Sequence, residues 1–222
     1  MNIRKIFSIT LCLLMVVSST LALSSCTSTS TTSSSGDFAA TDAQITVDSN
    51  YSNSPSNYVA TNKIEIKIKD KGTIAVDLYG NLAPITVKNF LTLINDKFYD
   101  GLTFHRIISG FMIQGGDPLG NGTGGSKDVI KGEFSANGIQ NYLSHERGVI
   151  SMARANAYDS ASSQFFIMHQ STPSLDGQYA AFGRVTSGLD VVDELAKTPV
   201  TDGNGTVERA NQPIIEYIKE VK

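Results

Sequence analysis

The first regular alternation of apolar and polar residues begins well inside the chain. Residues 63–69 alternate strictly between isoleucine and charged side chains, and residues 73–79 alternate again after a turn signal at 70–72. Because successive side chains of a strand point to opposite faces, each segment predicts a β-strand with one buried face. The short connection between them indicates a β-hairpin.

Helical spacing replaces this alternation in two places. A helix is predicted to begin at Pro84, because proline is tolerated in a first turn and apolar residues from Ile85 to Phe98 recur at roughly helical spacing. A second, short helix is predicted over 188–197, where three apolar residues share one face.

Short apolar runs between glycine-rich turns make up most of the remaining folded sequence. They lie at 148–152, 164–168 and 180–185, and a last strand is predicted over 214–219. Many short strands with only two helices are typical of an antiparallel barrel. The predicted fold class is therefore mainly β, with a closed antiparallel β-barrel.

The N-terminal part of the chain has the order of an export signal. Arg4 and Lys5 precede an apolar stretch over 6–23, which ends in Leu-Ser-Ser-Cys. This ending resembles the lipobox of bacterial lipoproteins, in which the cysteine is lipidated and becomes the first mature residue. We expect residues 1–25 to be a signal peptide and Cys26 to carry the lipid. The alternatives are an ordinary signal peptide and an uncleaved anchor helix, although polar residues within the stretch weaken the second.

Residues 26–57 are polar and rich in serine and threonine, so they bury too little apolar area to fold. We interpret them as a flexible tether, with an O-glycosylated stalk as the alternative. Residues 58–222 then form one domain. The two cysteines, Cys12 and Cys26, both precede that domain, which excludes a disulfide or a cysteine metal site within it. A formal net charge of −3 argues against nucleic acid as the main partner.

Four segments of the domain carry its most specific patterns. They are FHRIISGFMIQGGD at 104–117, GTGG at 122–125, ISMARA with SQFFI at 150–155 and 163–167, and LDGQYAAFGRV at 175–185. In this order and spacing they resemble the cyclophilins, from about Asn62 to the C-terminus. The resemblance implies a closed eight-stranded antiparallel barrel capped by two α-helices, with a shallow peptide groove on its outer wall.

The resemblance also implies a role for each residue of that groove. Arg106 matches the catalytic arginine, and Gln114 matches the residue that orients it and contacts substrate. The other matching positions fall into three groups: the proline pocket of Phe111, Met112, Phe166 and Leu175; the site for residues preceding proline, with Ala153, Arg154 and Gln164; and the edge, with His105 and Tyr179.

These residue types suit the rotation of an X–Pro bond. The barrier of about 18–20 kcal/mol comes from amide resonance, which is lost as the bond twists and the proline nitrogen becomes pyramidal. A fixed cation with N–H donors near that nitrogen stabilises the twisted state more than the planar one. Arginine suits this task because its fork is planar, always charged and can be braced by a neighbour such as Gln114. No metal or cofactor is needed.

Two positions depart from the family pattern. Ser174 stands where many cyclophilins have a tryptophan that contributes to cyclosporin binding, so we expect weak binding of that drug. Arg154 stands where other members carry asparagine. Its contact with substrate is expected to use the backbone, and its charge to favour acidic residues near the proline.

Other motifs in the chain have weaker interpretations. Residues 120–125 fit G-x-G-x-x-G but follow no clear strand, so we predict a surface loop that needs positive φ rather than a dinucleotide site. His105, His145 and His169 lack metal-ligand spacing, and each is expected to make a local hydrogen bond. A serine hydrolase is disfavoured because the chain has no G-x-S-x-G elbow and no suggestive Ser/His/Asp order.

The sequence therefore predicts a monomeric peptidyl-prolyl cis/trans isomerase without cofactor. Its expected partners are proline-containing peptides and unfolded exported proteins, and it is expected outside the cytoplasm, anchored to a bacterial membrane through the lipid on Cys26. A non-catalytic module that binds proline peptides in the same groove is the alternative.

Overall fold

The structure is a computed structural model that describes residues 58–221. The predictions for the signal peptide, the tether and Cys26 fall outside the described residues. Within 58–221, neither α-helix combines the length and the apolar character that crossing a bilayer requires.

The predicted hairpin is confirmed as β1 (Asn62–Ile68) and β2 (Gly72–Leu78), which pair antiparallel. The isoleucine, valine and leucine residues of both strands are buried, while the residues between them are at least partly exposed. The alternation in the sequence therefore marks one face of the sheet that covers the core.

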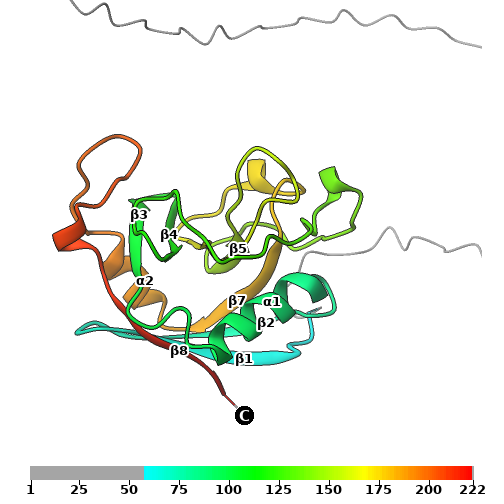
Figure 1. Cartoon of the computed structure of the whole chain (residues 1–222), viewed down its shortest axis with the longest axis horizontal. Helices are drawn as coiled ribbons and strands as arrows, with labels where there is room; N and C mark the ends of the chain where they lie inside the picture. The colour runs from blue at the N-terminus through cyan, green and yellow to red at the C-terminus, as the bar shows by residue number, and fades with distance from the viewer. Residues whose placement is uncertain (1–57, 222) are drawn as a thin grey trace, which may run out of the picture. The chain divides into compact units, whose positions relative to one another are not determined.

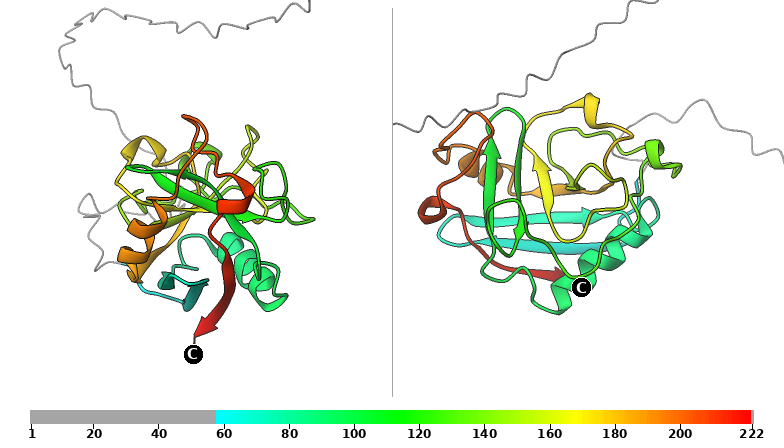
Figure 2. Two further views of the ribbon diagram at one scale, coloured as in Figure 1. Left: turned by 90° about the vertical axis from the view of Figure 1, so that its left-hand side faces the viewer. Right: turned by 45° about the horizontal axis from the view of Figure 1, so that its top comes forward.

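Six further strands extend the hairpin into a single sheet. They are β3 (Thr103–Ile108), β4 (Met112–Asp117), β5 (Val149–Met152), β6 (Phe165–Met168), β7 (Ala181–Ser187) and β8 (Ile215–Val221). The strand order is β3-β4-β6-β5-β7-β2-β1-β8, and every neighbouring pair is antiparallel. The sheet curls strongly, so that β3 and β4 run across the direction of β1 and β2 (Figure 2).

The predicted closed barrel is wrong, because the sheet is an open half-barrel. Its two edge strands, β3 and β8, form no ladder with each other, and an isolated bridge between Thr103 and Ile214 joins their ends. The preceding Pro213 has no N–H to donate. Further along β3, the irregular segment 205–207 takes the place of a strand. Ile107 N donates to Gly205 O at 2.8 Å, and Val207 N donates to His105 O at 3.0 Å.

Both predicted helices are present. Helix α1 (Pro84–Asn95) packs against β8, and α2 (Leu189–Leu195), shorter than the predicted 188–197, packs against β2 (Figure 1). The side-chain carboxylate of Glu133 accepts hydrogen bonds from Ile85 N at 3.0 Å and Thr86 N at 2.7 Å. A residue almost fifty positions away thus satisfies the first N–H groups of α1.

The sheet buries apolar side chains on both of its faces. On the inner face, the ring of Phe90 from α1 lies 5.4 Å from Phe165 and 5.1 Å from Phe182. On the outer face, Phe166 and Met168 belong to a second, smaller cluster. Because neighbouring residues of β6 point to opposite faces, Phe165 enters the main core and Phe166 supports the outer surface where the site lies.

Candidate active site

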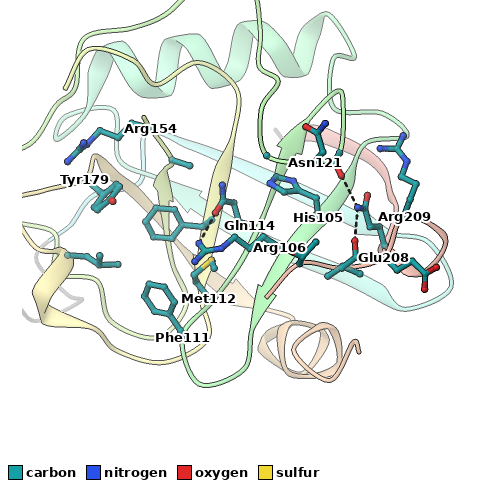
Figure 3. Close-up of a pocket in the computed structure, with 18 residues that line it drawn as sticks. His105, Arg106, Phe111, Met112, Gln114, Asn121, Arg154, Tyr179, Glu208 and Arg209 are labelled. Carbon is teal, nitrogen blue, oxygen red and sulfur yellow. Dashed lines mark hydrogen bonds between the residues drawn. The ribbon is translucent and has the colours of Figure 1, made fainter. Parts of the chain in front are cut away.

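A β-bulge in β3 sets the direction of Arg106. The pairing of β3 with β4 aligns Phe104 with Gly115 and Arg106 with Gln114, which leaves His105 as an extra residue. Bulges of this kind bend a strand and re-aim its side chains. Arg106 consequently points along the groove on the outer face, towards Gln114 (Figure 3).

Two hydrogen bonds hold the Arg106 guanidinium in place. Its Nε donates to Asn204 O at 2.9 Å, and Nη1 donates to Gln114 Oε1 at 3.2 Å. Gln114 is itself held, because its Nε2 donates to Gln164 Oε1 at 2.9 Å, and Gln164 Nε2 donates to Gly124 O at 2.7 Å. The chain of two amides fixes the acceptor that faces Arg106, which agrees with the predicted brace.

A groove of about 580 Å³ runs beside Arg106. Ten of the eleven predicted site residues line it: His105, Arg106, Phe111, Met112, Gln114, Ala153, Arg154, Phe166, Leu175 and Tyr179. The eleventh, Gln164, lines the adjoining cavity together with the glycine-rich loop. Phe166 and Met112 form the floor of the groove and are almost completely buried, so the groove offers a preformed apolar surface to a small ring.

The far end of the groove was not predicted from the sequence. It is lined by Gly120, Asn121, Thr206, Val207, Glu208, Arg209 and Gln212. Figure 3 shows Asn121, Glu208 and Arg209 on the side of Arg106 opposite to Tyr179. These residues reach the groove because segment 205–207 bonds to the outer edge of β3 and Gln212 Nε2 donates to Gly120 O at 2.8 Å. The segment has no regular periodicity that would have located it.

The loop at 120–125 is a surface loop, as predicted, and a buried carboxylate organises it. Asp117 accepts hydrogen bonds from Leu119 N at 2.8 Å, Asn121 N at 3.0 Å and Gly122 N at 2.6 Å. Burial alone would raise the pKa of Asp117, but these backbone donors outweigh it and lower the pKa. Gly120 and Gly122 adopt φ values of 63° and 88°, which glycine adopts without strain.

The histidines differ from one another in a way the sequence did not predict. His145 and His169 make local hydrogen bonds as expected, and Gly110 N donates to His169 Nδ1 at 2.7 Å. His105 is 4% exposed, and neither ring nitrogen has a hydrogen-bond partner among residues 58–221. Burial lowers its pKa, with Asp117 opposing that effect, so the ring lies neutral beside Arg106.

An Asp–His–Ser chain, in which His145 and Ser151 are buried and Asp176 is partly exposed, lies beneath the groove. His145 Nδ1 donates to Asp176 Oδ1 at 2.9 Å, and Ser151 Oγ lies 3.0 Å from His145 Nε2. The arrangement has the order of a hydrolase triad, but Ser151 is completely buried and no substrate reaches it. The imidazole stacks on Phe166 with centroids 5.9 Å apart, so the chain supports the floor of the groove.

Comparison with known proteins identifies the family of the chain. Residues 63–219 match the family described as "Cyclophilin type peptidyl-prolyl cis-trans isomerase/CLD". Peptidyl-prolyl cis-trans isomerase B of Bacillus subtilis is 47% identical over 133 residues, which are 60% of this chain and 90% of that protein. A Helicobacter pylori isomerase is 44% identical over 135 residues, 60% of this chain and 80% of its own length.

A solved structure has the same fold. The crystal structure of a Cryptosporidium parvum cyclophilin type isomerase, determined in the presence of the dipeptide Ala-Pro, superposes with a TM-score of 0.64 at 32% identity, covering 72% of this chain and 99% of that one. The chain belongs to the cyclophilin-type peptidyl-prolyl cis-trans isomerase family. Its activity is the isomerisation of X–Pro peptide bonds.

Proposed function

We propose that this isomerase acts outside the cytoplasmic membrane, where it speeds the folding of exported proteins while a lipid on Cys26 anchors it. The order of basic residues, apolar stretch, Leu-Ser-Ser-Cys and polar tether supports the anchor. The absence of cysteine from residues 58–222 suits a compartment in which free thiols are oxidised.

The braced position of Arg106 beside an apolar pocket carries the catalytic part of the proposal. Its bonds to Asn204 and Gln114 use Nε and Nη1, which leaves Nη2 for a ligand in the groove. A proline ring against Phe166 would place its nitrogen near this cation, and rotation would then proceed with the ring clamped. A Cryptosporidium parvum relative was crystallised in the presence of Ala-Pro, which supports a proline peptide as the ligand here.

An isomerisation assay separates this function from a groove that binds proline peptides without turning them. Exchange spectroscopy on an Ala-Pro peptide measures both the dissociation constant and the interconversion rate of the bound peptide. An isomerase gives fast exchange between the cis and trans forms, whereas a binding module gives only a shift of bound resonances.

The anchor is tested in the full-length protein. We expect the mature N-terminal peptide of wild type to begin at a lipid-modified Cys26, and Cys26→Ser to abolish the modification and impair processing. Cys12→Ser is the matched control, because it changes the other cysteine within the apolar stretch and should leave the lipid in place. Fractionation and mass spectrometry give the answer, and an unmodified residue 26 in wild type would refute the anchor.

Location, clients and oligomeric state need separate tests. Protease digestion of intact host cells should remove the protein if it faces outwards, while a cytoplasmic protein should survive. Exported proteins that contain proline should refold more slowly in cells without the isomerase, and cytoplasmic proteins should be unaffected.

We propose that the domain is a monomer, because one chain supplies every residue lining the groove. Sedimentation measures the oligomeric state directly.

A further inference from the structure

The guanidinium of Arg154 has a different environment from that of Arg106. Its guanidinium carbon lies 4.7 Å from the ring centroid of Tyr179, 5.0 Å from that of Tyr158 and 5.2 Å from that of Phe134. Cations at such distances from aromatic faces are attracted by the ring quadrupoles. Three rings at once hold this cation against the end of the groove, where Figure 3 shows it beside Tyr179.

Backbone carbonyls take up the hydrogen-bonding capacity of the same guanidinium. Nε and Nη2 both donate to Gln178 O, at 3.1 and 3.0 Å, and Nη1 donates to Ala155 O at 2.9 Å and to Asn156 O at 3.3 Å. In the described part of the chain, the arginines in ion pairs are Arg147 and Arg184. The positive charge of Arg154 therefore interacts with backbone carbonyl dipoles and aromatic rings of the protein.

The three rings come from three different loops. Phe134 belongs to segment 131–137, Tyr158 to the segment that follows Arg154, and Tyr179 to segment 175–179. Other contacts tie these loops as well. Asp159 Oδ1 accepts from Gly132 N at 3.0 Å and from Asn137 Nδ2 at 2.7 Å, while Ala136 N donates to Gly177 O at 2.9 Å. Arg154 contacts all three loops and so links them.

One of these loops forms a wall of the proline pocket. Leu175 and Tyr179 both line the groove, and the Tyr179 ring meets Phe166 edge to face with centroids 5.7 Å apart. Arg154 therefore contacts, through Gln178 O and the Tyr179 ring, the loop that forms a wall of the proline pocket. By contrast, Arg106 is held by other residues, Gln114 and Asn204.

We propose that Arg154 is a positioning residue, which holds the 175–179 loop against the proline pocket and fixes its shape through the planar guanidinium. The proposal rests on the isomerase activity of the family but concerns the affinity of the groove rather than its chemistry. It replaces the expectation that the charge of Arg154 attracts acidic residues near the proline. With its guanidinium held in this way, we expect Arg154 to confer little preference for charge at the residue before proline.

Two substitutions separate shape from charge. Arg154→Gln removes both, whereas Arg154→Lys keeps the charge but has no planar fork to bond two carbonyls and stack between rings. We expect each variant to weaken binding of an Ala-Pro peptide about tenfold, equivalent to about 1.4 kcal/mol. The interconversion rate of the bound peptide should change by less than about twofold, because Arg106 keeps its own supports. Exchange spectroscopy yields both quantities.

Peptides with Glu, Gln or Lys before the proline complete the test. Wild type and both variants should bind the three peptides with equal ratios, within about twofold. Normal affinity of Arg154→Lys would overturn the proposal, as would a loss in Arg154→Gln confined to the Glu peptide. Equal loss of affinity and of bound-state rate would also overturn it, because that result would place Arg154 in the chemistry itself. A wild type without isomerisation would instead contradict the family activity.

A milder variant keeps the proposal testable if changes at Arg154 impair folding. Tyr158 is 41% exposed and does not line the groove, yet its ring stacks on the guanidinium. Tyr158→Leu should weaken peptide binding about two- to threefold, and Tyr158→Phe, which keeps the ring, should not. A loss that is the same in both variants would contradict the stacking role, as would no loss in Tyr158→Leu.

Discussion

At the scale of single residues, the imidazole of His105 and the guanidinium of Arg106 lie next to each other in the groove. His105 is the extra residue of the bulge, and its burial keeps it uncharged next to Arg106. A second positive charge here would repel the guanidinium and weaken its approach to the proline nitrogen. If Arg106 is the catalytic arginine, as predicted, its sequence neighbour His105 helps by remaining neutral.

Arg106→Ala should lower the isomerisation rate of bound peptide about 10²–10³-fold, which is typical for loss of one donor to a transition state. The domain should remain folded, because the guanidinium lies on the surface of the groove and supports no core side chain. Arg106→Lys should recover only part of the rate, since lysine has no fork for Gln114 to brace. Exchange spectroscopy and thermal melts check both variants, and near-normal turnover in a folded Ala variant would contradict the assigned role.

Ser174 supports a prediction about the drug cyclosporin. The residue is exposed and precedes Leu175, which lines the groove. A serine offers neither the apolar area nor the N–H donor of an indole. Cyclosporin should therefore inhibit wild type weakly, and Ser174→Trp should strengthen inhibition about tenfold or more. Titration of both proteins with the drug measures the difference, with Ser174→Ala as a control that should match wild type.

The residues of the groove were predictable to the extent that they lie in contiguous motifs. Arg106, Met112 and Gln114 fall within one hairpin, where a short pattern specifies all of them. Asn204 was missed because it supports Arg106 from 98 positions away through a backbone carbonyl, which any residue type supplies. The contacts of Arg154 with three rings could not be predicted, because the rings come from three loops that are far apart in the sequence.

At the scale of the elements, helix α1 depends on a residue outside itself. Ala83 at its N-cap offers no side-chain acceptor, and the Glu133 carboxylate accepts from the first turn instead. Glu133 is 2% exposed and precedes Phe134, one of the rings around Arg154. The helix on the inner face and the loops on the outer face are thereby connected through two consecutive residues.

Substitution of Glu133 should test this connection. Glu133→Ala removes the acceptor of the buried Thr86 N–H and of the partly buried Ile85 N–H at the positive end of a helix, and we expect a loss of about 2–4 kcal/mol in the free energy of unfolding. Glu133→Gln keeps one acceptor oxygen and should lose about half as much. Denaturant unfolding measures both values. Equal stability of the Ala variant and wild type would mean that solvent replaces the carboxylate without cost.

The closed barrel was predicted wrongly because closure depends on backbone partners rather than on side-chain pattern. Pro213 lies where the last strand would approach β3, and segment 205–207 occupies the edge instead. Apolar periodicity located β8 correctly but carries no information about which edge it joins. Six of the strands and both helices were predicted from the pattern, and the total of eight strands followed only from the family resemblance. The gap between the edges was not predictable.

At the scale of the whole molecule, two buried histidines couple stability to pH. Burial is the main cause that lowers the pKa of both His105 and His145 below the ordinary 6.5. The unfolded chain therefore binds protons first as the pH falls. Their contribution to stability is fully present above pH 6.5 and is lost as the pH falls from there towards the pKa of the folded state.

Thermal melts between about pH 5 and pH 8 should show this loss on the acid side. Asp117 and the other carboxylates with lowered pKa add their own loss only below about pH 4, so the loss due to the histidines begins at a higher pH than that due to the carboxylates. His145→Gln should be less stable than wild type at neutral pH but should show a shallower decline towards pH 5. An unchanged decline in both His145→Gln and His105→Gln would show that other groups cause it.

The register that pairs Lys63 with Val221 unites the first and last strands of the domain. During synthesis, one edge of β1 stays unpaired until the C-terminal residues leave the ribosome, and an unpaired strand edge is a template for aggregation. Closing so long a loop also slows folding, because its entropy is lost before any contact forms. A peptidyl-prolyl isomerase thus cannot complete its own sheet before its final seven-residue strand has been made.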